Sequence, residues 1–381
     1  LFLQGTDILY RVPGNVNQFS GWPINPAAIQ TFNPATGIPT SGGPVQLTGF
    51  PENLPTPITY RYSLGTEYNF ASDWVGKLGY QGSTTHHYTR QTNFNWYFMP
   101  LNPRIQSLTF YLNDANANYD ALLAEVEHRF SHSFQFDVQY RWSHTIDDGS
   151  NDYYIGQYPF GLQYLRGDAD FDVRHNLKVY GIWNPRIFKG NGWAEKILGG
   201  WQITGILNAN SGFPWTPLYS NTGCNVVYAN SGYCNLRPAG YLGNAGTDYS
   251  NSTFEKAGAN FPNGALAYFT VPTFPASGIP PAPSVGRNVL RGPGYFDTDM
   301  TLQKSFGLPK LPIFGENARF EFRADFFNIF NKTNLQGLAN SGNPYPGNII
   351  SSDGVSSNPQ FGVPQAGLSG RVINLQARFS F

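Results

Sequence analysis

The last eleven residues, 371–381, alternate between apolar and polar side chains. The apolar positions are Ile373, Leu375, Ala377, Phe379 and Phe381, and the polar positions between them are Asn374, Gln376, Arg378 and Ser380. A period of two predicts a β-strand with one apolar and one polar face. A strand of about ten residues with aromatic ends is compatible with a soluble sheet and also with a membrane-spanning barrel strand.

The same alternation recurs along the chain and predicts a protein made of strands. It is clear in 58–70, 134–142 and 320–326, weaker in 118–130, 171–184, 197–212 and 294–306, and present again from Trp74 to about Arg90. With the last strand this makes nine strands, and residues 1–5 are a tenth candidate. Glu321, Arg323 and Asp325 lie opposite the phenylalanines of their strand. A lipid-facing Arg or Lys costs about 2–4 kcal/mol at the bilayer midplane, so these charges are expected to line the interior of a barrel.

The predicted connections alternate between short and long. Residues 71–73 and 131–133 are three-residue turns, and 185–196 and 307–317 are moderate links. The long connections are 91–117, 147–170, 213–293 and 331–370. An outer-membrane barrel has short periplasmic turns on one rim and long extracellular loops on the other. We therefore expect an all-β, antiparallel transmembrane β-barrel. The alternative, a soluble two-sheet protein with a Phe-rich core, does not explain the alternation of loop lengths.

Charge and hydropathy narrow the class of protein. The chain has 24 basic and 24 acidic residues, so it offers no excess charge for a nucleic acid or an anionic surface. No apolar run approaches the roughly 20 residues of a transmembrane helix. The chain opens on Leu1 with no visible signal peptide, and we expect residues 1–381 to be the C-terminal portion of one barrel domain.

The two cysteines, Cys224 and Cys234, lie in a polar stretch within the longest predicted loop. A disulfide that closes this short loop is the favoured interpretation and implies an oxidising compartment. Two free thiols are the alternative. A metal site is disfavoured because no histidine lies near by.

Four stretches, in this order and spacing, resemble a known family. They are Tyr119–Phe130; Phe171–Asn176, which leads to Gly200–Gln202; Gly286–Gly294; and Phe322–Asn331. The set is similar to the C-terminal half of TonB-dependent outer-membrane receptors, most closely the Oar-like group, whose full chains carry an N-terminal carboxypeptidase-regulatory-like domain. The resemblance covers most of residues 58–381.

The resemblance implies a fold and partners. The fold is a barrel of about 22 strands closed inside by a plug, of which this chain would supply about ten strands. The expected partners are outer-membrane lipid, the TonB complex through a preceding N-terminal part, and the barrel-assembly machinery. Phe379 and the terminal Phe381 resemble the signal that this machinery reads.

No catalytic, cofactor or metal site is predicted, and no enzyme activity. Asp168, Asp170 and Asp172 place three carboxylates at alternate positions, where a calcium site is conceivable. The favoured alternative is a solvated rim that pairs with Arg166 and Arg174.

Aromatic side chains in the predicted outer loops are candidate ligand contacts. They are Trp96, Tyr97, Tyr153, Tyr154, Trp215 and Tyr219. The leading functional hypothesis is uptake across the bacterial outer membrane of a scarce large ligand, of the siderophore, oligosaccharide or peptide class. A surface adhesin or structural protein, and a passive porin, are the alternatives.

Overall fold

The computed structural model describes most of the chain. The described residues are 35, 45–93, 105–150, 158, 161–186, 192, 195, 197, 199–220, 235–243, 261–271, 282–307, 318–336, 338, 347–351, 355–364 and 366–380. No helix among them is long and apolar enough to cross a membrane.

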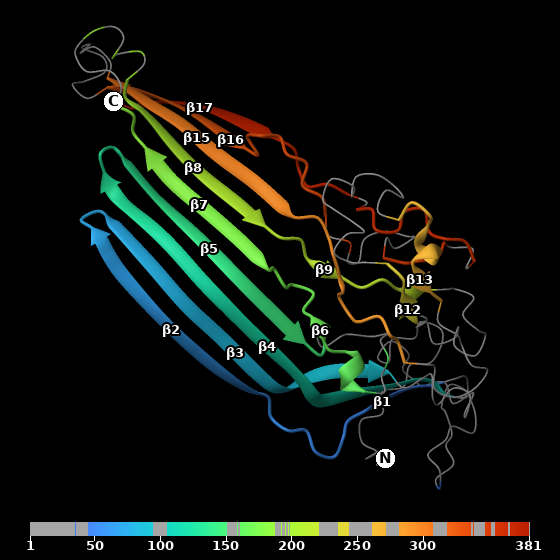
Figure 1. Cartoon of the computed structure of the whole chain (residues 1–381). Coiled ribbons are helices and arrows are strands. Elements are labelled where there is room, and N and C mark those ends of the chain that lie inside the picture. The colour runs from blue at the N-terminus through green and yellow to red at the C-terminus, as the bar shows by residue number, and fades with distance from the viewer. Residues whose placement is uncertain are drawn as a thin grey trace, which may run out of the picture.

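One antiparallel meander of nine long strands dominates the structure (Figure 1). The strands are β2 (Ile58–Ala71), β3 (Trp74–Asn93), β4 (Ile105–Ser131), β5 (Phe134–Asp147), β7 (His175–Trp183), β8 (Trp201–Asn210), β15 (Tyr295–Gly307), β16 (Arg319–Phe327) and β17 (Val372–Ser380). Each pairs with the next of these strands in chain order. The nine predicted strands are confirmed; the tenth candidate, residues 1–5, lies outside the described residues.

The register places the alternating apolar residues of all nine strands on one face. Phe320 pairs with Phe379 and with Phe306, and Phe326 pairs with Ile373 and with Met300. Glu321 and Asp325 alternate with these phenylalanines and therefore lie on the opposite face. We name the two surfaces of the sheet the apolar face and the polar face.

Two tight turns, β2–β3 and β4–β5, and the moderate links β7–β8 and β15–β16 connect the strands at one end of the sheet, which we name the turn end. Ala71 pairs with Trp74 and Ser131 with Phe134, so each turn has two residues, one fewer than predicted. His132 and Ser133 have φ of 50° and 75°, which is the backbone of a type I′ hairpin turn. All the long connections lie at the opposite end, the loop end (Figure 1). The predicted alternation of short and long connections is confirmed.

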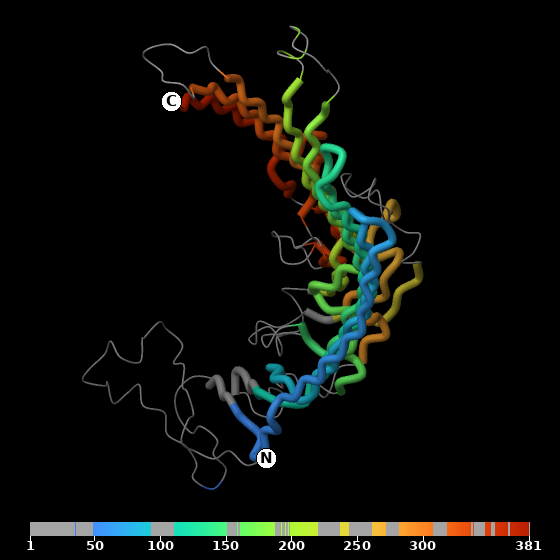
Figure 2. The backbone as a smooth tube through the Cα atoms, turned by 90° about the vertical axis from the view of Figure 1, so that its left-hand side faces the viewer, coloured from blue at the N-terminus to red at the C-terminus, as the bar shows by residue number. Residues whose placement is uncertain are grey.

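The sheet bends into an open arc when it is viewed from the side (Figure 2). Its edge strands are β2 and β17, which do not pair with each other, and every position of both strands is exposed. An unpaired edge presents free backbone N–H and C=O groups that lipid cannot satisfy.

Two strands continue well beyond the others at the loop end. β3 reaches Asn93 and β4 begins at Ile105, so the long loop predicted over 91–117 is largely strand. The short strand β1 (Val45–Gly49) pairs in parallel with the start of β4. Residues 50–57 then follow the hairpin: Phe50 stacks on Tyr111 with ring centroids 5.4 Å apart, and Asn113 Nδ2 donates to Pro55 O at 2.9 Å.

The segments at the loop end form a small packed body, which we name the cap. Its described elements are η2 (Leu162–Tyr164), β6 (Gly167–Asp168), β9 (Pro214–Trp215), β10 (Tyr219–Ser220), β11 (Asn235–Leu236), β12 (Gly240–Tyr241), η3 (Ala265–Ala267), β13 (Phe269–Thr270) and β14 (Leu290–Arg291). Residues from two connections, β8–β15 and β16–β17, build its hydrophobic core: Trp215, Tyr219, Phe261, Ala265, Phe269, Leu290, Leu338, Ile349, Ile350 and Phe361.

Candidate functional site at the loop end

A buried arginine joins the cap to the end of the sheet. The side chain of Arg287 has no exposed surface and forms ion pairs with Asp147 and with Asp170, the latter at 3.4 Å. Its Nε donates to Leu165 O at 2.8 Å, and its Nη2 donates to Asp147 O at 2.7 Å. A buried guanidinium requires such a complete set of acceptors. Arg287 therefore holds together the end of β5, the 161–174 segment and the 282–291 segment.

A second arginine repeats this arrangement four residues later. Arg291 forms ion pairs with Asp168 and with Asp172, whose side chain is fully buried. Arg174 approaches the same two carboxylates, at 3.4 Å from Asp168 and 3.7 Å from Asp172. Asn288 adds hydrogen bonds from Nδ2 to Asp168 O and to Asp170 Oδ1, at 2.7 and 2.6 Å. We name these residues, together with His144 and Asp147, the aspartate–arginine network.

The network favours the ionised form of Asp168. Burial opposes ionisation of this carboxyl, but the hydrogen bond with His144, at 2.8 Å, and the charge of Arg291 outweigh it, so the pKa of Asp168 is lowered. The negative charge of Asp168 is thus part of what holds the cap segments together.

The same residues test the calcium hypothesis of the sequence. His144, Asp168 and Asp172 bring donor atoms within 4.8 Å of one another. The two carboxylates, however, already accept from Arg291 and Arg174, which supply the positive charge that a cation would bring. The predicted pairing with Arg174 is confirmed. Arg166 differs from the prediction: it pairs with Asp148, at 3.3 Å, and its Nη2 donates to Asn118 Oδ1 at 2.8 Å.

A polar hollow of about 370 Å³ lies on the polar face, just below the 161–174 segment. Its lining is Ser83, Ala117, Asn118, Tyr119, Arg141, Ser143, Thr145, Phe171 and Val173. None of these residues is acidic, and Arg141 Nε is buried with no hydrogen-bond partner among the described residues. Phe171 is 57% exposed. A guanidinium, several hydroxyl groups and an aromatic ring together suit a ligand rich in oxygen atoms.

Nearer the turn end, the charges of the polar face are paired with one another. Lys77 Nζ lies 2.6 Å from Glu125 and 3.2 Å from Glu127, and Tyr180 donates to Asp137 at 2.8 Å. Gln303 donates to Glu321 at 2.8 Å. A wall of paired polar groups tolerates water, not hydrocarbon.

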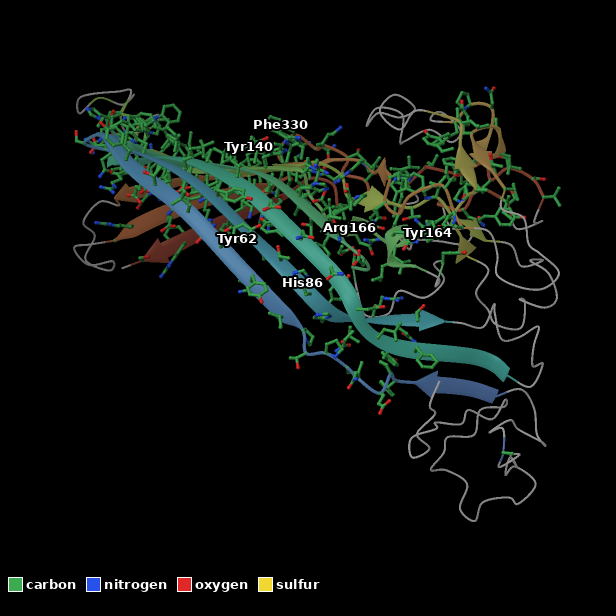
Figure 3. The ribbon with its side chains drawn as sticks, turned by 60° about the horizontal axis from the view of Figure 1, so that its bottom comes forward. Tyr62, His86, Tyr140, Tyr164, Arg166 and Phe330 are labelled. Atoms are coloured by element: carbon green, nitrogen blue, oxygen red, sulfur yellow. The ribbon has the colours of Figure 1, made fainter. Side chains whose placement is uncertain are left out.

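Aromatic residues mark both borders of the apolar face. At the turn end, Trp74 packs edge-on against Phe136 with ring centroids 5.4 Å apart. Towards the loop end, Tyr62 and Tyr80 both donate to Asp120 Oδ1, at 2.9 and 2.6 Å. Figure 3 shows Tyr62 on the sheet, and Arg166 and Tyr164 where the cap begins. Two such belts with apolar residues between them are typical of a protein surface that spans a bilayer.

The comparison with protein families agrees with this geometry. Residues 7–374 match the model described as "Outer membrane beta barrel domain". The chain belongs to this family.

Membership of the outer membrane β-barrel family orients the molecule. The protein resides in the bacterial outer membrane, its apolar face contacts lipid, and its polar face lines the interior. The turn end is periplasmic, and the loop end with the cap is extracellular.

Three solved structures with a similar chain trace are remote in sequence. The outer membrane transporter YddB from Escherichia coli is 9% identical, with a TM-score of 0.45 over 88% of this chain and 34% of that one. The FpvAI–pyocin S2 complex is 10% identical, with a TM-score of 0.41 over 85% of this chain and 28% of that one. The copper transporter OprC is 7% identical, with a TM-score of 0.35 over 86% of this chain and 32% of that one. The barrel chain thus spans about a third of the length of these structures. No curated protein matches it.

The predicted site residues fall into two groups. Trp96, Tyr97, Tyr153, Tyr154, Cys224, Cys234 and Phe381 lie outside the described residues. Trp215 and Tyr219 are 1% and 8% exposed and belong to the core of the cap. Ligand contact through these two residues remains a prediction. Phe379 is 62% exposed on the edge strand β17, and its role in assembly also remains a prediction.

Sequence reasoning missed Arg287 and Arg291 as organisers of the site. Both lie in the 286–294 stretch, one of the four stretches that resemble TonB-dependent receptors. Their partners are more than 100 residues earlier in the chain. The only local signal of this role was a stretch with two arginines between glycines. The sequence does not show which aspartates these arginines contact.

Proposed function

We propose that this barrel is the C-terminal part of a TonB-dependent receptor of the Oar-like group, and that it imports a scarce ligand too large for porins. The hollow around Arg141 carries the proposal. It lies on the interior face, directly below the extracellular cap, and its guanidinium has a buried nitrogen without a partner among the described residues. A ligand that passes the cap would meet this hollow first.

The open sheet supports a larger assembly. Nine strands form an arc, and both of its edges are unpaired in the described part of the chain. Edge strands in lipid must be completed by further strands, because nothing else satisfies their backbone groups. We therefore propose that further strands of the same protein join β2 to β17, and that they enclose a lumen wide enough for a plug.

The ligand class follows from the lining of the hollow. Hydroxyl groups, an amide, an arginine and an exposed phenylalanine fit siderophores, oligosaccharides and peptides alike. The proposed partners are the TonB complex, through a preceding N-terminal part, and the barrel-assembly machinery, through β17. A disulfide between Cys224 and Cys234 is proposed for the cap.

Uptake by cells that express the full-length protein tests the proposal. Radiolabelled ferric siderophores, malto-oligosaccharides and peptides are supplied to cells with and without a protonophore that collapses the proton-motive force. We expect one class to accumulate, accumulation to stop with the protonophore, and Arg141→Ala to weaken it at least tenfold at low ligand concentration.

Two outcomes would contradict import. Entry that the protonophore does not change, together with ion conductance in planar bilayers, would indicate a passive porin. Surface binding with no accumulation of any probe would indicate an adhesin.

A further inference from the structure

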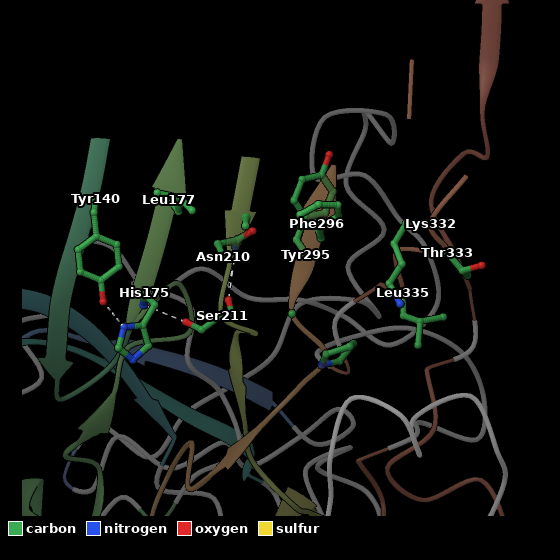
Figure 4. A pocket seen from close by; sticks show the side chains of 13 residues that line it. Tyr140, His175, Leu177, Asn210, Ser211, Tyr295, Phe296, Lys332, Thr333 and Leu335 are labelled. Carbon is green, nitrogen blue, oxygen red and sulfur yellow. Dashed lines mark hydrogen bonds between the residues drawn. The ribbon is translucent and has the colours of Figure 1, made fainter. Parts of the chain in front are cut away.

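A second hollow lies on the lipid-facing side of the barrel, at the loop end (Figure 4). Its volume is about 290 Å³. Tyr140, Leu177, Ala209 and Phe296 are in register across four neighbouring strands and form its apolar side. His175, Ser211, Lys332 and Thr333 contribute polar groups on the side nearer the cap. The hollow is therefore amphipathic along the membrane normal.

The apolar side continues the lipid-contacting surface without interruption. Leu177, Ala209 and Phe296 belong to the same face as the central residues Val179 and Leu207. Phe330 extends the surface beside the hollow: it is 67% exposed, and its ring centroid lies 6.2 Å from that of Phe296. An acyl chain in the outer leaflet can thus enter the hollow from the membrane.

The polar side carries positive charge and no negative charge. None of the lining residues is acidic, and Lys332 is exposed without an ion pair among the described residues. Arg371 lies on the adjoining segment, where its N–H donates to Asn331 Oδ1 at 3.0 Å. Cationic side chains just outside an apolar belt favour an anionic headgroup.

A rigid turn fixes the position of this lysine. The side chain of Asn328 accepts from Lys332 N and donates to Lys332 O, both at 2.9 Å. Asn328 and Asn331 both have positive φ, at 50° and 52°. At the other side of the hollow, the Tyr140 hydroxyl and His175 Nδ1 are 2.7 Å apart, and His175 N donates to Ser211 Oγ at 3.1 Å. The hollow is thus built from fixed parts on both sides.

We propose that this hollow binds a lipid of the outer leaflet whose headgroup bears phosphate. An acyl chain lies over Leu177, Ala209 and Phe296, and the phosphate lies against Lys332 and His175. This site is on the outside of the barrel and is independent of any ligand that passes through the interior.

Native mass spectrometry of the full-length protein, released from detergent micelles, tests the site. The probes are lipid A with both phosphates, the same lipid with its phosphates removed, and inorganic phosphate. We expect the phosphorylated lipid to remain bound and to bind at least tenfold more tightly than the dephosphorylated one, because a phosphate–lysine contact is a charge-assisted hydrogen bond. Lys332→Gln is expected to remove most of this preference.

Lys178→Gln is the matched control, because it removes the same charge from the polar face of the neighbouring strand β7. It is expected to leave lipid binding unchanged. Ala209→Phe, which fills the apolar side, is expected to weaken both lipids. Equal binding of the two lipids, or equal losses in Lys332→Gln and Lys178→Gln, would overturn the proposal. Competition by inorganic phosphate as strong as by the lipid would also overturn it, because the site would then hold phosphate alone.

Discussion

The membrane band and the cap of this barrel are stabilised in different ways. In the band, which is formed by the nine long strands, each strand hydrogen-bonds to its neighbours everywhere except at the two edges, and side chains alternate between lipid and interior. In the cap, short strands contribute few ladder bonds, and order comes from a core around Trp215 and from the buried Arg287. One chain thus combines two kinds of structure. The fold of the band is determined by the period of its side chains, as in membrane barrels, and the fold of the cap is determined by particular long-range contacts, as in soluble proteins.

Substitution of Arg287 is expected to have the largest effect and to destabilise the cap but not the band. Arg287→Ala leaves the buried carboxylate of Asp147 without its partner, and loss of one partner of a buried ion pair typically costs about 3–5 kcal/mol. We expect the cap to lose protection while the band stays folded. Hydrogen exchange of the 161–174 and 282–291 segments reports on the cap. The heat-modifiable gel mobility of the barrel, measured on the same samples, reports on the band.

Arg61→Ala is the control for this variant, because Arg61 is exposed on β2 and makes no ion pair among the described residues. If Arg287→Ala unfolds band and cap together, the two regions are one cooperative unit and the comparison fails.

A pair of neighbouring substitutions tests the band. Leu207 lies on the apolar face between Val179 and Thr298, and Ile206 lies on the polar face. Leu207→Arg is expected to cost about 2–4 kcal/mol, since the charge enters the hydrocarbon. Ile206→Arg is expected to cost little, because it faces the interior. Denaturant unfolding of the full-length protein in lipid vesicles measures both, and similar losses would refute the assignment of the two faces.

The type I′ turn offers a smaller gain in stability. Ser133 has a φ of 75°, a conformation that costs a residue with a Cβ about 1–2 kcal/mol. Ser133→Gly is expected to stabilise the β4–β5 hairpin by up to about 1 kcal/mol in the same unfolding assay. Ser72→Gly, in the β2–β3 turn where φ is not positive, should give no gain; an equal gain there would show that turn flexibility alone is responsible.

Acid should loosen the cap before the band, and this is the smallest effect expected. The pKa of Asp168 is lowered, so its contribution is complete above the unfolded value of about 3.9 and is lost as the pH falls through the lower folded value. Hydrogen exchange of the 161–174 segment should therefore rise in strong acid. Asp168→Asn should remove part of this pH dependence, and an unchanged profile would mean that other groups control it.

The sequence predicted the band well because alternation is a local signal. Phe320, Phe322 and Phe326, which lie within seven residues, predict the apolar side of β16. The extension of β3 and β4 beyond the membrane was missed because its side chains do not alternate. Phe110, Tyr111 and Leu112 are consecutive in β4, and the polar residues Arg90 and Asp114 form an ion pair at 2.6 Å. An alternating apolar pattern does not predict a strand that extends beyond the lipid.

Contacts of the cap were out of reach for a different reason. Arg287 contacts Asp170 across 117 residues, and no periodic pattern encodes such a pair.

Lys304, near the turn end, is a residue whose position the alternation did not predict. It lies on the apolar face opposite Phe322, where the alternation predicts an apolar residue. Its ammonium instead donates to Ile197 O, at 2.9 Å, and to Gly199 O in the periplasmic link. A long side chain can leave the hydrocarbon in this way.

The spacing of the two aromatic belts sets a preferred membrane thickness. On β2, Tyr62 and Phe70 are eight residues apart. At about 3.3 Å per residue and a strand tilt of about 40°, that spacing spans roughly 20 Å along the membrane normal. This is less than the roughly 30 Å of an average bilayer. The bacterial outer membrane is thinner than average and suits such a surface. In a bilayer of average thickness, the protein should thin the lipid around itself and gather short-chain lipids, so acyl-chain length is a determinant of its stability.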